Sequence, residues 1–190
     1  MKKTIILVFT LICLLLGLGI AYSGEKAPKE IFDLANSKLI KLGLDPVIIE
    51  AVKAENQKGK TIERIKEMDE KWKAHAGIAD YMAAMMESEC GKYLRDIQNS
   101  TKYFSEIFVM DDKGANVAMT DKTSDYWQGD EAKFQKSFNG GQGSLFVDEV
   151  EFDDSTQAYL VQVSFPVKEG NQVIGAVTVG IDIDRMMESD

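Results

Sequence analysis

The sequence predicts an α+β protein in which N-terminal helices lead into a five-stranded antiparallel sheet. Between residues 28 and 97, apolar residues recur every three or four positions, which is typical of helices that bury one side. After residue 103, short segments rich in β-branched and aromatic residues alternate with turns rich in Asp, Gly and Asn. Because the helices come first and the strands follow in short meanders, this order indicates an α+β domain.

The first half of the helical region contains recognisable helix ends. We expect a first helix over residues 28–42, with Gly43 at its C-terminal cap. Asp45 followed by Pro46 is typical of an N-cap and a first helical residue, so a second helix begins there. Thr61 can cap a third helix, whose apolar face ends at Trp72.

The second half of the helical region predicts one long amphipathic helix over residues 78–97, after a break near Gly77. We expect Cys90 to be buried on its apolar face, because free cysteine has a strong preference for the interior. His75 has no second His or Cys at ligand spacing, so we interpret it as an exposed helix residue rather than a metal ligand.

The strand region divides into five strands and one helix. In the fourth strand, Tyr159, Val161, Val163 and Phe165 share one face, and we expect this odd-numbered face to pack inward. We place a short helix, over residues 130–138, between the second and third strands. The expected strands are residues 104–110, 115–119, 145–152, 158–167 and 173–183.

The N-terminus has the pattern of an export signal. Lys2 and Lys3 precede an apolar run over residues 5–20, and Ala21-Tyr22-Ser23 fits a cleavage site. We expect residues 1–23 to be a signal peptide that directs the protein to the periplasm. The alternative is an uncleaved signal that anchors the protein, because the run is close to the length that spans a membrane. The mature chain then divides into a helical lead-in, residues 24–102, and a sheet core, residues 103–190.

Charge is distributed unevenly along the chain. Residues 24–102 contain 14 basic and 14 acidic residues, whereas residues 103–190 contain 6 basic and 17 acidic residues. An acidic surface disfavours nucleic acid, which binds through basic patches. Cationic ligands are compatible with this charge, and so is a simple role in solubility. The acidic turn from Glu149 to Asp154 lacks the spacing of a calcium loop, so we expect no metal site.

Three segments of the second half carry a family resemblance. They are EIFVMDDKGANVAMTDKTSDYWQGDEAKFQKSF from Glu106 to Phe138, VSFPV from Val163 to Val167, and VIGAVTVGIDID from Val173 to Asp184. Together these segments resemble the Cache superfamily of PAS-like extracytoplasmic sensors. The resemblance lies in the order of a strand, a D-x-x-G turn, a strand, a polar loop, Gly-Asp and a helix, followed by the motifs S-x-P-V and I-G-x-x-x-x-x-I-D. Upstream, the stretch from Asp45 to Ile97, which contains DEKW at Asp69 to Trp72, looks like the helical lead-in of small stand-alone periplasmic members.

The resemblance implies a small-molecule pocket between the sheet and the loop and helix that cover it. Aromatic residues of the loop can enclose a ligand while carboxylates accept its hydrogen bonds. In amino-acid-binding relatives, an Asp near the end of the last strand receives the ligand's amino group, and Asp182 matches that position. The loop carries Lys122 but no Arg for a ligand carboxylate, which does not favour an α-amino acid. The predicted site residues are Asp125, Tyr126, Trp127, Asp130, Tyr159 and Asp182.

Each of these residues also has a purely structural interpretation. Tyr126 and Trp127 could close the edge of the core, and Asp130 could cap the helix that follows it. Asp182 could be a hydrated strand end, since a bare buried carboxylate would cost several kcal/mol.

The predicted function is that of a periplasmic sensor that binds a small organic ligand for signal transduction or chemotaxis. No nucleophile elbow, phosphate-binding glycine loop or HExxH motif occurs, so we expect neither an enzyme nor a cofactor. The sequence shows no transmitter after the sheet, which makes a membrane-bound receptor or sensor kinase a candidate partner. The alternatives are a non-sensing interaction protein on the same scaffold and a membrane-anchored accessory sensor.

Overall fold

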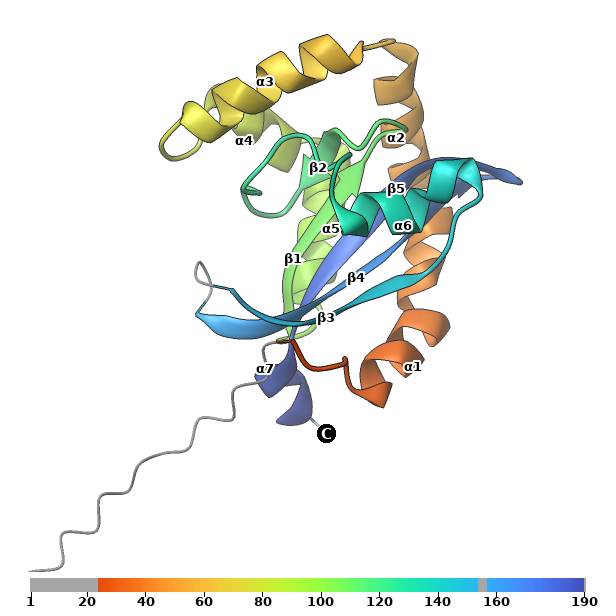
Figure 1. The fold of residues 1–190 in the computed structure, drawn as a ribbon, viewed down its shortest axis with the longest axis vertical. Helices are drawn as coiled ribbons and strands as arrows, with labels where there is room; N and C mark the ends of the chain where they lie inside the picture. The colour runs from red at the N-terminus through yellow and green to blue at the C-terminus, as the bar shows by residue number, and fades with distance from the viewer. Residues whose placement is uncertain (1–23, 154–156, 190) are drawn as a thin grey trace, which may run out of the picture.

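The computed structural model describes residues 24–153 and 157–189, and the predicted signal peptide lies outside this part of the chain. The helical half wraps one side and one end of the molecule (Figure 1). No helix in the described ranges is long and apolar enough to cross a membrane. The elements of this half are α1 (Lys29–Ser37), the 3-10 helix η1 (Leu39–Leu44), α2 (Pro46–Gln57), α3 (Ile62–Ala74), α4 (Asp80–Met86) and α5 (Glu89–Asn99).

The second half forms a five-stranded sheet in the order β2-β1-β5-β4-β3, and every neighbouring pair is antiparallel. The predicted fold class is therefore confirmed. The last strand of the sequence lies at the centre, as its almost continuous apolar run favours. The elements are β1 (Phe104–Met110), β2 (Asn116–Met119), α6 (Ala132–Phe138), the 3-10 helix η2 (Asn139–Gly141), β3 (Phe146–Asp153), β4 (Ala158–Glu169), β5 (Gln172–Asp182) and α7 (Ile183–Met187).

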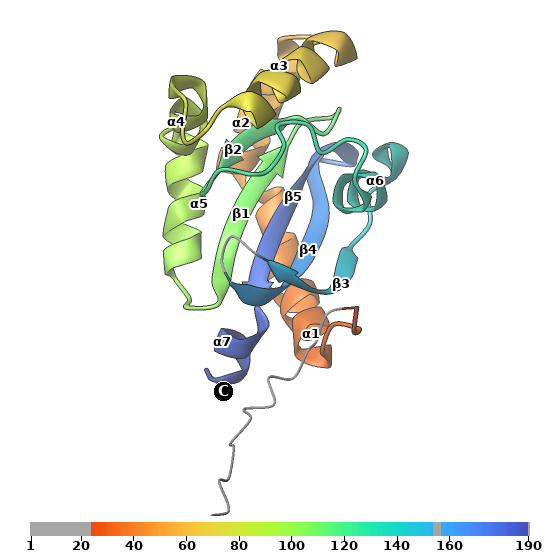
Figure 2. The same ribbon diagram turned by 60° about the vertical axis from the view of Figure 1, so that its left-hand side comes forward.

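One face of the sheet packs against α1, η1, α2 and α5 (Figures 1 and 2). Odd-numbered residues of β1, β4 and β5 point to these helices. Val161, Val163 and Phe165 are fully buried there, which confirms the predicted inward face of β4, while Tyr159 is half-buried. The buried Cys90 belongs to the same core, and burial, followed by the nearby Asp45 and Glu89 carboxylates, raises the pKa of its thiol to about 12.

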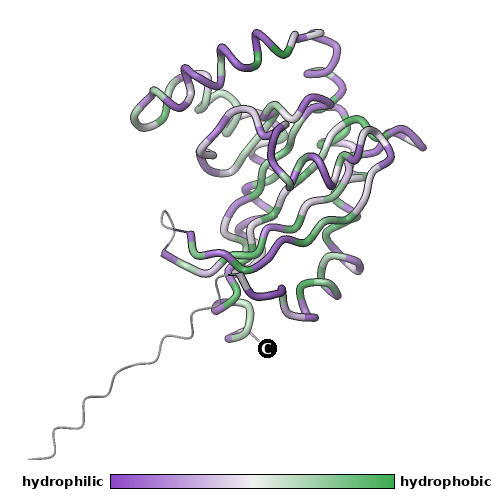
Figure 3. Tube along the Cα trace, in the orientation of Figure 1, coloured by the Kyte–Doolittle hydropathy of each residue, from purple (hydrophilic) through white to green (hydrophobic). Residues whose placement is uncertain are grey.

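The opposite face of the sheet is covered less completely, by α6 and by the loop between β2 and α6 (Figure 2). A second, smaller core lies at its upper end, where α3 and α4 pack on the loop and on even-numbered residues of β1. Most of α3 is hydrophilic (Figure 3), so this helix is held by a few buried side chains, chiefly Ile65 and Trp72.

Four local predictions need correction. The first predicted helix ends at Ser37, and Gly43 lies inside η1 rather than at a helix cap. Glycine is needed at position 43 because an added Cβ would be 2.1 Å from the Pro166 carbonyl oxygen. The long helix predicted for residues 78–97 is two helices, α4 and α5. The hydroxyl of Ser88 accepts a hydrogen bond from the Gly91 amide at 2.9 Å and starts α5 as an N-cap.

The two remaining corrections concern helix ends near acidic residues. Helix α6 begins at Ala132 after Glu131, and Asp130 is exposed outside it. The last strand ends at Asp182, whose carboxylate accepts a hydrogen bond from the Arg185 amide and opens α7. The caps predicted at Asp45 and Thr61 are confirmed by their hydrogen bonds to the Val47 and Arg64 amides.

Candidate functional site

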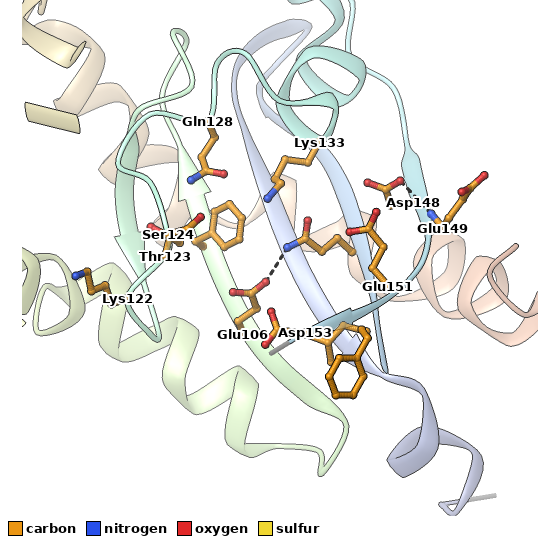
Figure 4. Close-up of a pocket in the computed structure, with 14 residues that line it drawn as sticks. Glu106, Lys122, Thr123, Ser124, Gln128, Lys133, Asp148, Glu149, Glu151 and Asp153 are labelled. Carbon is orange, nitrogen blue, oxygen red and sulfur yellow. Dashed lines mark hydrogen bonds between the residues drawn. The ribbon is translucent and has the colours of Figure 1, made fainter. Parts of the chain in front are cut away.

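A cavity of about 530 Å³ lies over the less covered face of the sheet, between β1, β4, β3, α6 and the loop from β2 (Figure 4). This volume is within the range of small-molecule sites. Its floor is a row of residues across three strands. Glu106 of β1 and Gln162 of β4 both pair with Gly180 of β5, which lies between them.

Glycine at position 180 allows the floor to form. A Cβ there would lie 2.6 Å from Glu106 Cγ, so a side chain would displace the glutamate. Without it, Gln162 Nε2 donates a hydrogen bond to Glu106 Oε1 at 2.8 Å across the intervening strand. The floor therefore presents a carboxylate that is oriented by an amide and still has capacity to accept further hydrogen bonds.

The loop and α6 supply the upper wall of the cavity. The Lys133 side chain points from α6 toward the floor (Figure 4), ion-pairs with Glu131 at 2.9 Å, and lies 5.6 Å from the centre of the Phe108 ring. Gln128 is fully buried at this wall, and its Nε2 donates to the Asp125 carbonyl at 2.8 Å. Its Oε1 accepts no hydrogen bond from any residue that the structure describes.

Strand β3 gives the cavity an acidic rim. Its pairing with β4 shifts between Val147 and Val150, and such irregularities re-aim side chains. In the part of the chain that the structure describes, no three His, Cys, Asp or Glu side chains are arranged as a metal site. The acidic rim residues are Asp148, Glu149, Glu151 and Asp153.

The Glu106 carboxyl has an altered acidity. Burial raises its pKa above the ordinary range, and the hydrogen bond from Gln162 and the charge of Lys133 oppose this effect. The negative charges of Asp153 and Asp121 add to the increase. A cation placed beside Glu106 would favour its ionised form.

The loop that forms the upper wall is fixed to α3 by specific hydrogen bonds. Asp69 is buried, and its Oδ1 accepts from the backbone amides of Tyr126 and Trp127 at 2.8 and 3.0 Å. The indole of Trp72 donates to the Thr123 carbonyl at 2.7 Å. The residues Asp69 and Trp72 of the DEKW segment therefore position the wall of the cavity, a role that the helical pattern alone did not indicate.

A second anchor lies at Lys60, between α2 and α3. Its ammonium contacts Glu55 Oε1 at 2.8 Å, Asp111 Oδ2 at 3.2 Å and the Tyr126 hydroxyl at 2.7 Å. Burial lowers the pKa of Lys60, but hydrogen bonds to Glu55 and Tyr126 and the charge of Asp111 outweigh it, so the net pKa is raised. This network joins the helical half to the turn after β1 and to the loop.

The predicted loop residues lie beside the cavity rather than in its lining. Tyr126 is buried in the smaller core, where its ring centre is 5.6 Å from that of Trp72. The Trp127 indole donates to the Lys113 carbonyl at 2.8 Å, and Lys66 lies over its ring. Asp125 pairs with Lys73 at 3.0 Å. The structure brings these three residues together at α3.

The other three predicted residues are dispersed. Asp130 is exposed before α6, and the Tyr159 ring packs against Phe152 on β3. Asp182 lines a separate cavity at the end of the sheet near α7, where it pairs with Arg185 at 3.2 Å. Contact of any of the six residues with a ligand stays a prediction.

Several lining residues were missed from the sequence, although some carry a signal. Glu106 interrupts an apolar strand, and Gln162 is a polar residue on the even-numbered face of β4. Gln128 and Lys133 have no comparable signal, because only the folded loop and α6 direct them toward the sheet.

The two central glycines of β5 give a prediction about the floor. We expect Gly180→Ala to lower the free energy of unfolding by only about 1 kcal/mol, because the Glu106 side chain can move. Gly175→Ala is the matched control, since its Cβ would be 2.3 Å from the backbone oxygen of Met110, which cannot move easily. We expect it to cost about 2 kcal/mol. Urea denaturation measures both, and an equal loss would contradict the stated role of Gly180.

The family of the chain follows from its second half. Residues 81–188 match the family described as methyl-accepting chemotaxis protein-like, first PDC sensor domain, and the match covers more than half of the chain. The chain belongs to this family. The Cache-type resemblance is thereby confirmed, and this PDC domain is a sensor domain of the methyl-accepting chemotaxis protein-like type. A comparison with curated protein sequences gives no match.

The solved structures that are similar to this PDC domain have low sequence identity to it. The ligand-binding domain of Campylobacter jejuni chemoreceptor Tlp3 in complex with 4-methylisoleucine has 13% identity and a TM-score of 0.42, covering 84% of this chain and 60% of that one. The extracellular domain of histidine kinase vpHK1S-Z8 has 10% identity and a TM-score of 0.49, covering 85% and 54%. The ligand-binding domain of Pseudomonas aeruginosa PAO1 chemoreceptor PctC in complex with GABA has 13% identity and a TM-score of 0.39, covering 85% and 62%. The chain thus spans less than two thirds of each.

Proposed function

We propose that this PDC domain is an exported sensor that binds a small organic ligand in the cavity above Glu106, Gly180 and Gln162. The observation that carries the proposal is the cavity itself, which combines a volume of about 530 Å³ with polar groups that converge from the sheet, the loop and α6. We further propose a periplasmic location and a membrane-bound receptor or sensor kinase as partner. Binding without catalysis is the proposed activity.

A thermal shift screen tests this function with small carboxylates, amino acids, amines and purines. A ligand that binds only the folded state, at about a hundred times its dissociation constant, adds about 2.7 kcal/mol of stability. For a domain of this size, we expect the melting temperature to rise by roughly 5–10 °C. No shift with any compound would favour the alternative of a non-sensing interaction protein.

Three variants locate the site. Ser124 is exposed and lines the cavity, so Ser124→Trp should fill the opening and abolish the shift while leaving the core unchanged. Trp127→Phe and Asp182→Asn alter residues outside the cavity lining, so these two variants should retain the melting shift. Loss of the shift in the latter two but not in Ser124→Trp would assign binding to the residues predicted from sequence.

A further inference from the structure

The charge of the cavity lining is predominantly negative. Among the residues that the structure describes, five carboxylates and two lysines line it, and the carboxylates come from both its floor and its rim. A cleft lined by one sign of charge concentrates ligands of the opposite sign. Charge alone does not define a site, but it favours a cationic occupant over an anionic one.

The two lysines already have partners. Lys133 pairs with Glu131 at 2.9 Å and lies over the Phe108 ring, so its charge is matched within the protein. Lys122 donates to the His75 carbonyl at 2.7 Å. A ligand carboxylate would have to compete with these contacts and with the acidic rim.

The Gln128 side chain is independent evidence for the chemistry of the occupant. It is fully buried at the cavity wall, and its Oε1 lacks a hydrogen-bond donor among the described residues. Its Nε2 is engaged with the Asp125 carbonyl, and this contact requires the amide to be oriented with Oε1 as the unpaired atom. An unpaired buried acceptor costs about 1–3 kcal/mol, which a ligand donor would recover.

We propose that the cavity takes a cationic amine, with Glu106 and Gln128 Oε1 accepting hydrogen bonds from its N–H groups. The inference rests on the proposed ligand-binding function and names the ligand class. Ammonium groups supply both the positive charge that the lining favours and the donors that both acceptors require. Gln162 holds the Glu106 carboxylate in place by its hydrogen bond. The acidic rim on β3 accommodates a second positive charge at the other end of the ligand.

Calorimetry with three probes of equal chain length tests the inference. 1,4-Diaminobutane, 4-aminobutanoate and succinate carry net charges of about +2, 0 and −2 at neutral pH, from the usual amine and carboxyl pKa values. We expect 1,4-diaminobutane to bind most tightly and succinate least. Tighter binding of succinate or 4-aminobutanoate would overturn the inference, as would no binding of 1,4-diaminobutane at millimolar concentration.

Glu106→Gln tests the residue assignment. Loss of the charged acceptor should weaken 1,4-diaminobutane binding by about 10- to 100-fold. Glu63→Gln removes the same charge from an exposed position on α3 outside the lining, and it should leave the affinity unchanged. An unchanged affinity in Glu106→Gln, or an equal loss in both variants, would overturn the assignment.

The ligand-free stability of Glu106→Gln distinguishes lost binding from lost folding. Folding raises the pKa of Glu106 above the ordinary glutamate range. The wild type therefore loses stability as the pH rises from that ordinary range through the raised pKa, because the carboxyl ionises more easily in the unfolded chain. The neutral amide avoids this penalty. We therefore expect the variant to match the wild type at acidic pH and to be at least as stable at neutral pH.

The screen described above separates the two proposals. A carboxylate or an uncharged compound whose melting shift is abolished by Ser124→Trp would support the ligand-binding function and overturn the amine inference. Absence of a shift with every compound, amines included, would count against both.

Discussion

Replacing Trp72 with alanine is expected to lower the free energy of unfolding by about 3–5 kcal/mol, as truncation of a large buried aromatic residue does. Trp72 is fully buried, its ring centre lies 5.6 Å from that of Tyr126 and 6.0 Å from that of Tyr81, and its indole donates to Thr123. The variant loses this packing and leaves the Thr123 carbonyl without its indole donor. The melting temperature should fall by about 6–20 °C.

Ile62→Ala is the matched control for Trp72→Ala, because Ile62 lies on the same helix but is 36% exposed. We expect it to cost less than about 1 kcal/mol. Guanidinium denaturation of both variants measures the difference. Similar losses of stability would show that contacts along the whole of α3 stabilise it equally, and that Trp72 does not anchor the loop.

Replacing Lys60 with methionine is expected to cost about 3 kcal/mol, the second largest effect. The substitution keeps much of the apolar stem but leaves Asp111, which is 2% exposed, without its cation. It also removes the donor to the Tyr126 hydroxyl. Breaking a buried pair on one side is costly because the remaining charge is uncompensated. Denaturation at neutral pH measures this loss.

Lys58→Met provides the comparison, since Lys58 pairs with the same Glu55 but its side chain is 62% exposed. An exposed pair contributes about 0–1 kcal/mol, so little change is expected. If both lysine variants lost the same stability, the loss would come from the shared ion pair with Glu55, and the buried contact of Lys60 with Asp111 would not contribute measurably.

The sequence predictions were accurate where the interacting residues lie close together in the chain. The cap at Asp45 and the turn after β1 depend on residues close together in the chain, and both were predicted correctly. The break at Ser88 was missed because the apolar spacing continues through it. A single hydroxyl that caps the next helix does not disturb that pattern.

The candidate site shows the same limit more clearly. An aromatic loop was expected to face the sheet, but Asp69 binds two of its backbone amides and directs Tyr126 and Trp127 toward α3. Asp69 lies 57 residues before Tyr126 in the chain, so periodicity and turn chemistry cannot reveal this contact. The lining residues Gln128 and Lys133 depend on the same placement of the loop.

The sequence by itself determined the order of helices and strands, the inward face of β4 and the family of this PDC domain, because these depend on local periodicity and on the order of short segments. The tertiary structure alone decided that Glu106 and Gln162 meet across Gly180, and which side of the loop faces them. The contact arises because β1, which is distant in sequence, pairs in this register with β5 of the β4–β5 hairpin. A site built from such contacts becomes visible only when the sheet is assembled.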